Sequence, residues 1–458
     1  MQSLLFVLGT ATTAIAASDA CRFNSACYQP ADVIQRDVAI IGGGATGTYS
    51  AITLSDEGKQ VVVIEKEAVL GGHTNTYIDP ATGTAVDYGV IAYWNTTLVQ
   101  DFFARLDVAL GPMSRGATNQ TLHVDFQTGA SVTDVVTSAD LTGYQTQLQK
   151  YPYLLEGWDL PSPVPEDLLL PFGDFVTKYG LQDSAFTLYN AGAAGGLGSI
   201  LEQLTVTVMK ADSLAFMQEL NGGVVTTAQH HNHQLYDNAL QELGSNVLLQ
   251  STVVAAERAA NESVKLVVRT ASGTKLVIAS QLLVTAPLTL DNMAPFALDP
   301  KERALFSQFQ NTAYYCGLVS QTGLQAGASY VNTGADTPYH IPEFPSLYHV
   351  SPTAVDGLYS FWYGGDHTLV EAEVKANISA TIQRLSGSNQ PVEFVAFSSH
   401  TPFSLHVPAE AIADGFYTKL NRLQGHRNTW YTGALFTPSA ATVWDFTRQL
   451  LPSIISRL

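Results

Sequence analysis

The sequence predicts an α/β fold in which a parallel sheet and its helices are interleaved with a second, α+β domain. An apolar run at 37–41 is followed by a glycine turn, a helical segment and a second apolar run at 60–65, the order of a βαβ unit. The region 246–285 instead has the β-branched pattern of antiparallel strands, with a turn at Ser272-Gly273. The first pattern predicts the parallel sheet and the second an antiparallel extension of it.

Length and composition predict a folded protein of two domains. The chain has 458 residues, 46% of them hydrophobic and only 14% charged, whereas disordered chains combine low hydrophobicity with high charge. Because this length exceeds one comfortable core, we expect a discontinuous first domain (35–105, 220–298 and 410–458) and a second domain (106–219 and 299–409). The net charge of −18 argues against a nucleic-acid partner and against an electrostatic membrane anchor.

The first residues predict secretion. Residues 1–20 combine an apolar run with small residues and candidate cleavage sites at 16–20, which is typical of a signal peptide and too short to span a membrane comfortably. Cys21 and Cys27 flank a short loop in which a disulfide is allowed outside the cytosol, and we expect Cys316 to be a buried, inert thiol. Four glycosylation sequons begin at Asn95, Asn119, Asn261 and Asn377.

The rest of the chain predicts alternating blocks of helix and strand. A helical pattern from 95 to about 110 is followed by a Pro-rich stretch at 161–165. Residues 166–220 are mainly helical, with a glycine-rich break at Gly192–Gly198. Residues 312–365 alternate aromatic and apolar runs with turns, which predicts a second sheet. The end of the chain predicts a strand and then a helix from about Ser439.

The turn at Gly42–Gly47 matches the pattern G-x-G-x-x-G, follows one predicted strand and opens a helix. Gly42 allows the tight turn, Gly44 lets the backbone approach a pyrophosphate, and Gly47 allows close packing of helix on strand. The helix N-terminus offers unpaired N–H groups and the positive end of its dipole to phosphates. Glu65 lies 18 residues past Gly47, where a carboxylate accepts ribose hydroxyls and repels a 2′-phosphate. The pattern therefore predicts a site for FAD or NAD, and not for NADP.

Two motifs after this unit distinguish FAD from NAD. Leu70–Thr76 contains a Gly-Gly pair, and Val86–Gly89 follows it. At this point the sequence resembles the flavin-dependent amine oxidase superfamily, in which an acidic residue at the end of the second strand precedes a "GG-R" loop. His73 stands in place of the arginine, so a fixed cationic phosphate contact would become a titratable one. The alternative for His73 is a polar loop residue that contacts no ligand.

Three later segments agree with this resemblance, which is closest to the fungal β-cyclopiazonate dehydrogenase-like FAD oxidoreductases. Asn246–Arg258 resembles the strand lying against the adenine, and Leu282–Pro287 resembles the return from the inserted sheet. Thr429–Phe446 resembles the C-terminal flavin motif, whose helix N-terminus would face the flavin pyrimidine. The resemblance implies a Rossmann-type FAD-binding domain of the p-hydroxybenzoate-hydroxylase and amine-oxidase kind. With the glycine motif it assigns FAD binding to Gly42, Gly44, Ala45, Thr46, Gly47, Glu65, Lys66, Gly72, His73, Thr74, Val253, Val254, Gly433 and Val443.

Catalytic side chains are not assigned by these motifs. Tyr93, Trp94 and Tyr431 occur where the family lines its pocket, although plain packing explains each of them as well. The histidine-rich run at His230–His233 lacks the spacing of a zinc site, so we expect no metal. No G-x-S-x-G elbow is present, which argues against a common class of hydrolase.

The expected function is an FAD-dependent oxidoreductase that transfers a hydride to flavin N5 from a small amine-bearing or polycyclic specialised metabolite. The chain carries one dinucleotide fingerprint, and a secretory compartment supplies little NAD(P)H, so O₂ is the expected electron acceptor. Two alternatives stay open: a redox-neutral FAD-dependent isomerase or cyclase, and a protein that holds FAD without turnover. The patterns leave the oligomeric state undetermined.

Overall fold

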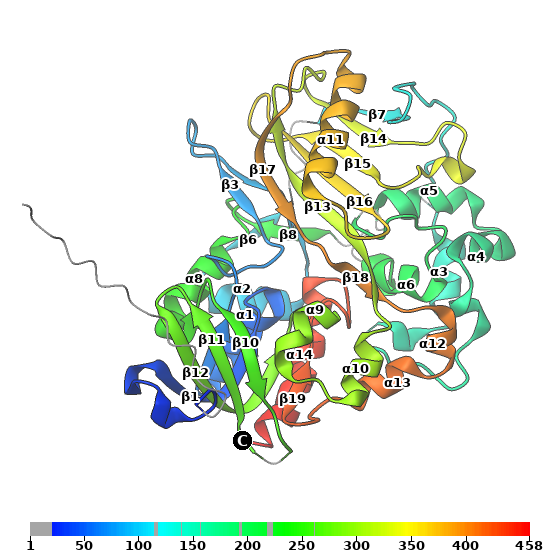
Figure 1. Ribbon diagram of the computed structural model, residues 1–458. Coiled ribbons are helices and arrows are strands. Elements are labelled where there is room, and N and C mark those ends of the chain that lie inside the picture. Colours follow the sequence, from blue (N-terminus) through cyan, green and yellow to red (C-terminus); the bar gives the residue numbers. More distant parts are fainter. Residues whose placement is uncertain are drawn as a thin grey trace, which may run out of the picture.

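The computed structural model describes residues 21–113, 118–138, 140–155, 157–191, 195–217, 223–260 and 262–458 (Figure 1). The predicted signal peptide at 1–20 and the sequon at Asn261 lie outside these residues. The described chain forms two sheets of seven strands each, with helices packed against both, as expected for an α/β and an α+β region that share one chain. Cys21 and Cys27 form a disulfide, with their Cα atoms 5.6 Å apart.

The first sheet contains the predicted βαβ unit. Strand β1 pairs in parallel with β2 on one side and with β12 on the other, and α1 connects β1 to β2. The two central runs, 38–40 and 61–64, are buried on both faces, which explains why they are continuously apolar. The elements are β1 (Val33–Ile41), α1 (Ala45–Asp56), β2 (Val61–Ile64), β9 (Val247–Leu248), β10 (Thr252–Glu257), β11 (Val264–Thr270), β12 (Gly273–Val284) and β19 (Thr429–Tyr431).

The antiparallel prediction for 246–285 is correct for β10, β11 and β12, which pair in that order. It is wrong for β9, because Val247 and Leu248 pair in parallel with Val63 and Ile64. The C-terminal strand β19 also joins this sheet in parallel, beside β12. The carboxyl ends of β1, β2, β12 and β19 therefore meet at one edge of the sheet, the usual place for a ligand in such folds.

The helices that cover the first sheet pack together through a large aromatic cluster. Trp444 of α14 is fully buried and lies within 6.2 Å, ring centroid to ring centroid, of Tyr49, Tyr93, Phe102 and Phe103. The predicted helix at 95–110 forms over a shorter range, and the predicted C-terminal helix begins at Ala440, next to its cap Ser439. The covering helices are α2 (Thr97–Arg105), α8 (Gln234–Leu243) and α14 (Ala440–Ile455).

The second sheet forms the upper part of the molecule in Figure 1. Its strand order is β17-β13-β16-β15-β14-β7, with β18 also paired to β13, and helix α11 packs on one face through Ile378 and Ile382. The predicted sheet at 312–365 is thus confirmed. Its elements are β7 (Gln120–Val124), β13 (Gln310–Ser320), β14 (Ala328–Asn332), β15 (Ser346–Pro352), β16 (Tyr359–Gly365), α11 (Glu371–Ser386), β17 (Glu393–Ser399) and β18 (Phe403–His406).

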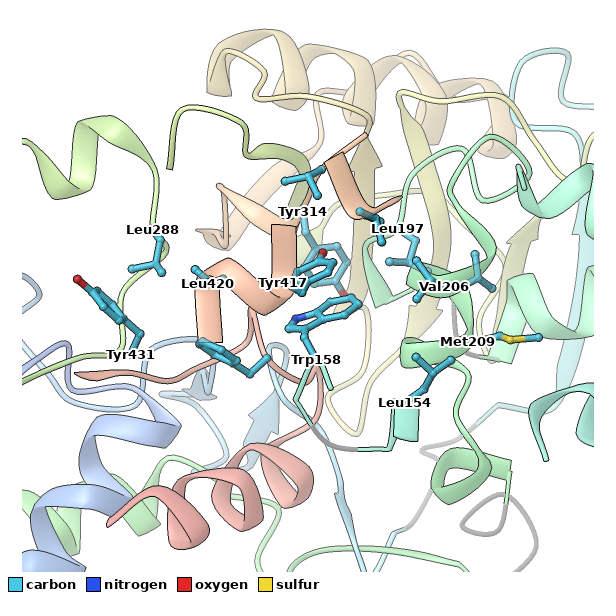
Figure 2. Packing of buried hydrophobic residues seen from close by; sticks show 14 of the residues in the cluster. Leu154, Trp158, Leu197, Val206, Met209, Leu288, Tyr314, Tyr417, Leu420 and Tyr431 are labelled. Carbon is cyan, nitrogen blue, oxygen red and sulfur yellow. The ribbon is translucent and has the colours of Figure 1, made fainter. Parts of the chain in front are cut away.

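A largely helical layer and short strands join the two sheets. Figure 2 shows the apolar core of this layer, in which Trp158 and Tyr417 stack with ring centroids 3.8 Å apart. Its elements are α3 (Thr142–Leu148), α4 (Phe172–Tyr179), α5 (Gln182–Ala191), α6 (Thr205–Ala211), α9 (Leu290–Met293), α10 (Pro300–Phe306), α12 (Ala409–Ala413) and α13 (Phe416–Asn421), with short strands β3 (Thr76–Ile78), β4 (Ala85–Asp87), β5 (Tyr93–Trp94), β6 (Leu110–Pro112) and β8 (Val224–Thr227). None of the described helices is long and apolar enough to cross a membrane.

Candidate cofactor site

The glycine turn joins β1 to the N-terminus of α1. Helix α1 begins at Ala45 after the cap Gly44, which supplies no side-chain acceptor, so the N–H groups of the first turn stay available to an anion. A Cβ at Gly47 would lie 1.8 Å from the carbonyl oxygen of Gly42, so only glycine fits there. The absence of room at Gly47 agrees with the close packing of helix on strand that the spacing predicts there.

Glu65 extends from the end of β2 to the same turn. One carboxylate oxygen (Oε2) accepts a hydrogen bond from the Gly43 N–H at 2.6 Å, and the other (Oε1) accepts one from the Glu67 N–H at 2.8 Å. The residue is 7% exposed, so these charge-assisted bonds lie in a largely desolvated place. Lys66 points instead to solvent, where it pairs with Glu67 at 3.6 Å.

The loop after β2 packs directly on the glycine turn. The Gly71 N–H donates to the Gly43 carbonyl at 2.9 Å, and a Cβ at Gly72 would lie 3.0 Å from the Gly44 Cα. Two backbone segments approach this closely only where side chains are absent. Thr74 is buried, and its hydroxyl lies 3.4 Å from the Tyr236 hydroxyl.

Strand β10 carries an irregularity where the sequence predicts an adenine contact. The register passes from Val253, opposite Val268, to Ala255, opposite Val267, so Val254 is an unpaired bulge residue at the outer edge of the sheet. Its side chain is 44% exposed, which is unusual for a valine in this sheet. The residue before this strand contacts the end of β2, because the Ser251 N–H donates to the Glu65 carbonyl at 2.8 Å.

The C-terminal glycine lies beside the first one. Gly433 has φ +117°, and a Cβ there would lie 2.8 Å from the Thr285 carbonyl oxygen. Thr285 in turn donates its hydroxyl to the Ile41 carbonyl at 2.8 Å, next to Gly42. Segments far apart in the sequence thus meet at the carboxyl edge of the first sheet.

Helix α14 also packs on the start of α1. The Trp444 indole N–H donates to the Ala45 carbonyl at 2.9 Å. Val443 is buried in the core, and its N–H donates to the Ser439 carbonyl at 2.9 Å within the helix. The N–H of Val443 is therefore used within α14, and its side chain packs in the same apolar cluster as Ala45 at the start of α1.

His73 points from this loop toward the second sheet. Its ring stacks on that of His400, with centroids 4.1 Å apart and planes 13° apart, and lies 5.6 Å from Phe403. Burial, assisted by the charge of Lys66, lowers the pKa of His73 to about 4. At neutral pH any contact by His73 would therefore be that of a neutral imidazole, unlike that of the arginine it replaces.

Two of the three aromatic residues that the family pattern singles out, Tyr93 and Tyr431, are held in the interior of the protein. Tyr93 is buried between Phe103 and Trp444. The Tyr431 hydroxyl donates to Glu302 at 2.9 Å. Sequence reasoning missed the residues that do face His73, namely His400 and Phe403, because no local motif marks them.

The histidine-rich run supports the loop after β2. His233 Nε2 lies 2.9 Å from the Leu70 carbonyl oxygen, and its Nδ1 lies 3.1 Å from Asp237. Among the residues that the structure describes, no three His, Cys, Asp or Glu side chains are grouped to hold a metal ion. A surface groove of about 840 Å³ lies along α2, β6 and β8 and includes none of the residues assigned to FAD. Cys316 is fully buried, and burial raises the pKa of its thiol.

Comparison with known proteins agrees with this geometry. Residues 40–106 match the family described as NAD(P)-binding Rossmann-like domain. The solved structure of the CLA-producing fatty acid isomerase from P. acnes has a TM-score of 0.72 and 18% identity, covering 91% of this chain and 98% of that one. A putrescine oxidase double mutant has a TM-score of 0.65 and 16% identity, covering 93% of this chain and 100% of that one. These two likenesses show the fold.

Sequence relatives show the family. The chain is 43% identical to the FAD-dependent oxidoreductase pigF of Monascus ruber, over 100% of both chains. It is 42% identical to the FAD-dependent oxidoreductase dbaF of Emericella nidulans, over 98% of this chain and 97% of that one. It is 34% identical to the beta-cyclopiazonate dehydrogenase of Aspergillus oryzae, over 93% of this chain and 94% of that one. The chain therefore belongs to the family of FAD-dependent oxidoreductases that these proteins represent.

Proposed function

We propose that the protein oxidises a small organic substrate, amine-bearing or polycyclic, with bound FAD and with O₂ as the final electron acceptor. The observation that carries the proposal is the meeting of Gly42–Gly47, Glu65 and Gly433 at one edge of the first sheet, facing the second sheet through His73. Such an edge is where dinucleotides bind in folds of this kind.

The residues present fit FAD. The free N–H groups at the start of α1 would hold the pyrophosphate, since the glycines there leave room that a Cβ would fill. Glu65 would accept the ribose hydroxyls with its remaining lone pairs, and the bulge at Val254 would present unpaired backbone to the adenine. When bound, FAD supplies the redox chemistry of the reaction.

The side chains at the junction of the two sheets would bind and orient the substrate. His73 presents an uncharged ring there, and Phe403, which packs on the buried Tyr314, supplies apolar surface that excludes water. Trp158 fixes the loop after Gly433 from the substrate side, because its indole N–H donates to the Leu435 carbonyl at 2.7 Å. The substrate contacts and the cofactor loop are thereby held in one packed unit.

Anaerobic flavin bleaching tests the proposal. Purified protein loaded with FAD is mixed with a panel of amines and of indolic and polyketide metabolites, and separately with NADPH. We expect a substrate to bleach the flavin without air and to yield peroxide in air, whereas NADPH leaves the flavin oxidised. A product of unchanged mass without oxygen consumption would indicate an isomerase or cyclase instead. Rapid bleaching by NADPH would contradict both the oxidase and the isomerase, because NADPH would then be the reductant of the flavin.

We also propose that the protein is secreted and glycosylated. The sequons at Asn119 and Asn377 are exposed, and the bridge between Cys21 and Cys27 suits an oxidising compartment. Expression in a eukaryotic host followed by intact-mass analysis should show loss of about the first 16–20 residues and at least one glycan. An unprocessed chain without glycans would contradict this.

A further inference from the structure

A continuous series of rings extends from the loop after β2 into the second sheet. His73 stacks on His400, whose ring centroid lies 5.7 Å from that of Tyr314. Tyr314 is 6.3 Å from Trp362, and Trp362 is 4.3 Å from His349. Phe403 lies beside the series, 5.0 Å from Tyr314. We call these six residues the ring wall: His73, Tyr314, His349, Trp362, His400 and Phe403.

Part of the ring wall is accessible to solvent. His73, His349, Trp362 and Phe403 all keep accessible surface, whereas Tyr314 and His400 behind them are buried. Neither ring nitrogen of His73 has a hydrogen-bond partner within the described ranges, and neither is among the fully buried polar atoms there. A polar ring held in a tight stack with its nitrogens unused is available to a ligand.

His400 holds this ring in place. Its Nε2 lies 3.0 Å from the Asn75 Oδ1, which accepts a hydrogen bond, so Nε2 carries the proton. Its backbone N–H donates to the Tyr314 carbonyl at 2.9 Å, and Cys316 Sγ lies 3.6 Å from Nε2. With both the ring and the backbone fixed, His400 is a rigid platform on which His73 stacks.

The ring wall carries no charge at neutral pH. Burial lowers the pKa of His349 to about 4, as it does for His73, and burial and then His73 hold the pKa of His400 well below its usual range. Burial raises the pKa of Tyr314 well above its usual value. No carboxylate contributes to any of these shifts, and the nearby charge acting on His73 is the cation Lys66.

These surroundings do not suit a cationic ligand. A buried ammonium group without a carboxylate partner loses its hydration and gains no ion pair in exchange. The positive charge of Lys66 also repels an ammonium group bound near His73. Aromatic faces attract cations, but that gain is about 2 kcal/mol when desolvated and does not replace an ion pair. A flat uncharged molecule instead gains from ring contacts and from a hydrogen bond to a neutral imidazole.

We propose that the ring wall binds an uncharged, planar, unsaturated substrate, that His73 forms a hydrogen bond to a hydroxyl or carbonyl oxygen of it, and that the wall discriminates against a protonated amine. This inference rests on the proposed function, because it narrows the substrate class of that same site. Asn75 and His400 are positioning residues that act through His73.

A matched pair of probes tests the proposal without turnover. 2-Naphthol and 2-naphthylmethylamine have the same ring system, but only the amine is charged at neutral pH. Equilibrium dialysis against FAD-loaded protein, read by naphthyl fluorescence, should give a dissociation constant at least about tenfold lower for the naphthol. If the amine binds as tightly, or if neither probe binds, the proposal is overturned. FAD content is measured first, so a protein that fails to hold FAD counts against the proposed function instead.

Two variants locate the effect on the ring wall. His73→Phe keeps the ring and removes the hydrogen bond, so naphthol binding should weaken about tenfold while naphthalene binding stays the same. Asn75→Asp places a carboxylate 3.0 Å from His400 Nε2 and should shift the preference toward the amine. His231→Phe, outside the wall, is the control and should leave both constants unchanged. An unchanged naphthol-to-amine ratio in both folded wall variants would overturn the assignment, and if neither folds the wild-type probe pair still decides.

Discussion

At Glu65 a single carboxylate organises two backbone segments before any ligand is bound. Its oxygens accept from Gly43 and from Glu67, which fixes the dinucleotide turn relative to the end of β2. An ionised carboxylate has about four lone-pair sites, so two of them remain for ribose hydroxyls. In the proposed function Glu65 thus both orders the turn and holds the ribose, so the effect of its substitution is measured as a change in FAD affinity.

We predict that Glu65→Gln weakens FAD binding at least about tenfold. The amide keeps the shape of the side chain but loses the charge, and its NH₂ cannot accept a hydrogen bond. The measurement is titration of the apoprotein with FAD, followed by quenching of flavin fluorescence. Glu67→Gln is the matched control, because its side chain is exposed and only its backbone N–H contacts Glu65. Equal FAD affinity for wild type and Glu65→Gln would remove the carboxylate from the site.

Gly47 is a second residue at which the geometry makes a strong demand. Its added methyl group would overlap the Gly42 carbonyl at 1.8 Å, and the neighbours there are backbone that cannot move aside. We predict that Gly47→Ala abolishes FAD retention through purification, read as absorbance of the bound flavin. Gly195→Ala, where nothing lies within 4 Å, should retain FAD. A yellow Gly47→Ala protein with native affinity would contradict the tight-turn model.

At the scale of elements, a buried ion network fixes the C-terminal strand. Arg258, just after β10, makes a two-bond pair with Glu302 of α10 at 2.8 and 2.9 Å, and both side chains are fully buried. Arg427 adds a bond to Glu302 at 3.2 Å, and Tyr431 of β19 donates to it at 2.9 Å. The network thus holds β19, and with it the start of the Gly433 turn, against the first sheet.

We predict that Glu302→Gln lowers the free energy of unfolding by about 3 kcal/mol, because it leaves Arg258 charged and without its partner in a desolvated place. Glu257→Gln, which breaks a partly exposed pair with Lys265, should cost less than about 1 kcal/mol. Burial raises the pKa of Glu302, but the bonds and charge of Arg258 outweigh it and hold the pKa below 4.5. The stabilisation that ionised Glu302 gives the folded protein is therefore fully present above pH 4.5, and it is lost as pH falls through the lower pKa of Glu302 in the folded state. Equal losses in the two variants, measured by denaturant unfolding, would contradict the network's role.

Elements whose contacts are local in sequence could be predicted, and those whose contacts are distant could not. The β1–α1–β2 unit follows from its own apolar runs and glycines, since its three parts are successive. The parallel pairing of β9 with β2 depends on where the intervening chain returns, and the run at Val247 carries no mark of direction. Pattern alone therefore predicts a strand there but not its partner.

The same distinction applies to the site. Gly42–Gly47 and Glu65 were predictable because each is required by its own turn or strand end. The motif marks His73 only as a departure from the family pattern. Its stacking partner His400 lies far along the chain, directly after β17 of the second sheet. The electrostatic state of His73 follows from that packing and not from its motif. Tertiary contacts thus decide what the loop residue can do.

At the scale of the whole molecule, the two sheets are joined by polar and aromatic contacts as well as by apolar packing. His400 contacts Asn75, the Ser398 hydroxyl lies 3.4 Å from that of Tyr88, and Trp158 donates to Leu435. The first two contacts connect the second sheet to the segment 75–88, and the third connects the helical layer to the loop after Gly433. The buried histidines at this junction connect the stability of the whole fold to their protonation.

The last prediction is that the protein loses stability as pH falls from about 7.5 to about 5. Burial lowers the folded-state pKa of several histidines below the unfolded value of 6.5, to about 4 for His73 and His349. Below pH 6.5 these histidines are therefore protonated in the unfolded chain but still neutral in the folded chain. The free energy of unfolding declines until pH reaches about 4. The histidines shifted in this direction are His73, His123, His231, His349, His400 and His406.

Two buried carboxyl groups act in the opposite direction. Burial raises the pKa of Asp87 to about 7 and that of Asp212 well above 3.8, so the folded chain takes up these protons first and gains stability on acidification. Because the shifted histidines outnumber them, the net effect should be destabilising, with each fully shifted histidine contributing up to about 2 kcal/mol between pH 6.5 and pH 5. Denaturant unfolding of the holoprotein at the two pH values measures it. His349→Gln should flatten the dependence and Asp87→Asn should steepen it, whereas the exposed His230→Gln should leave it unchanged. Stability that is constant or rises toward pH 5 would contradict the prediction.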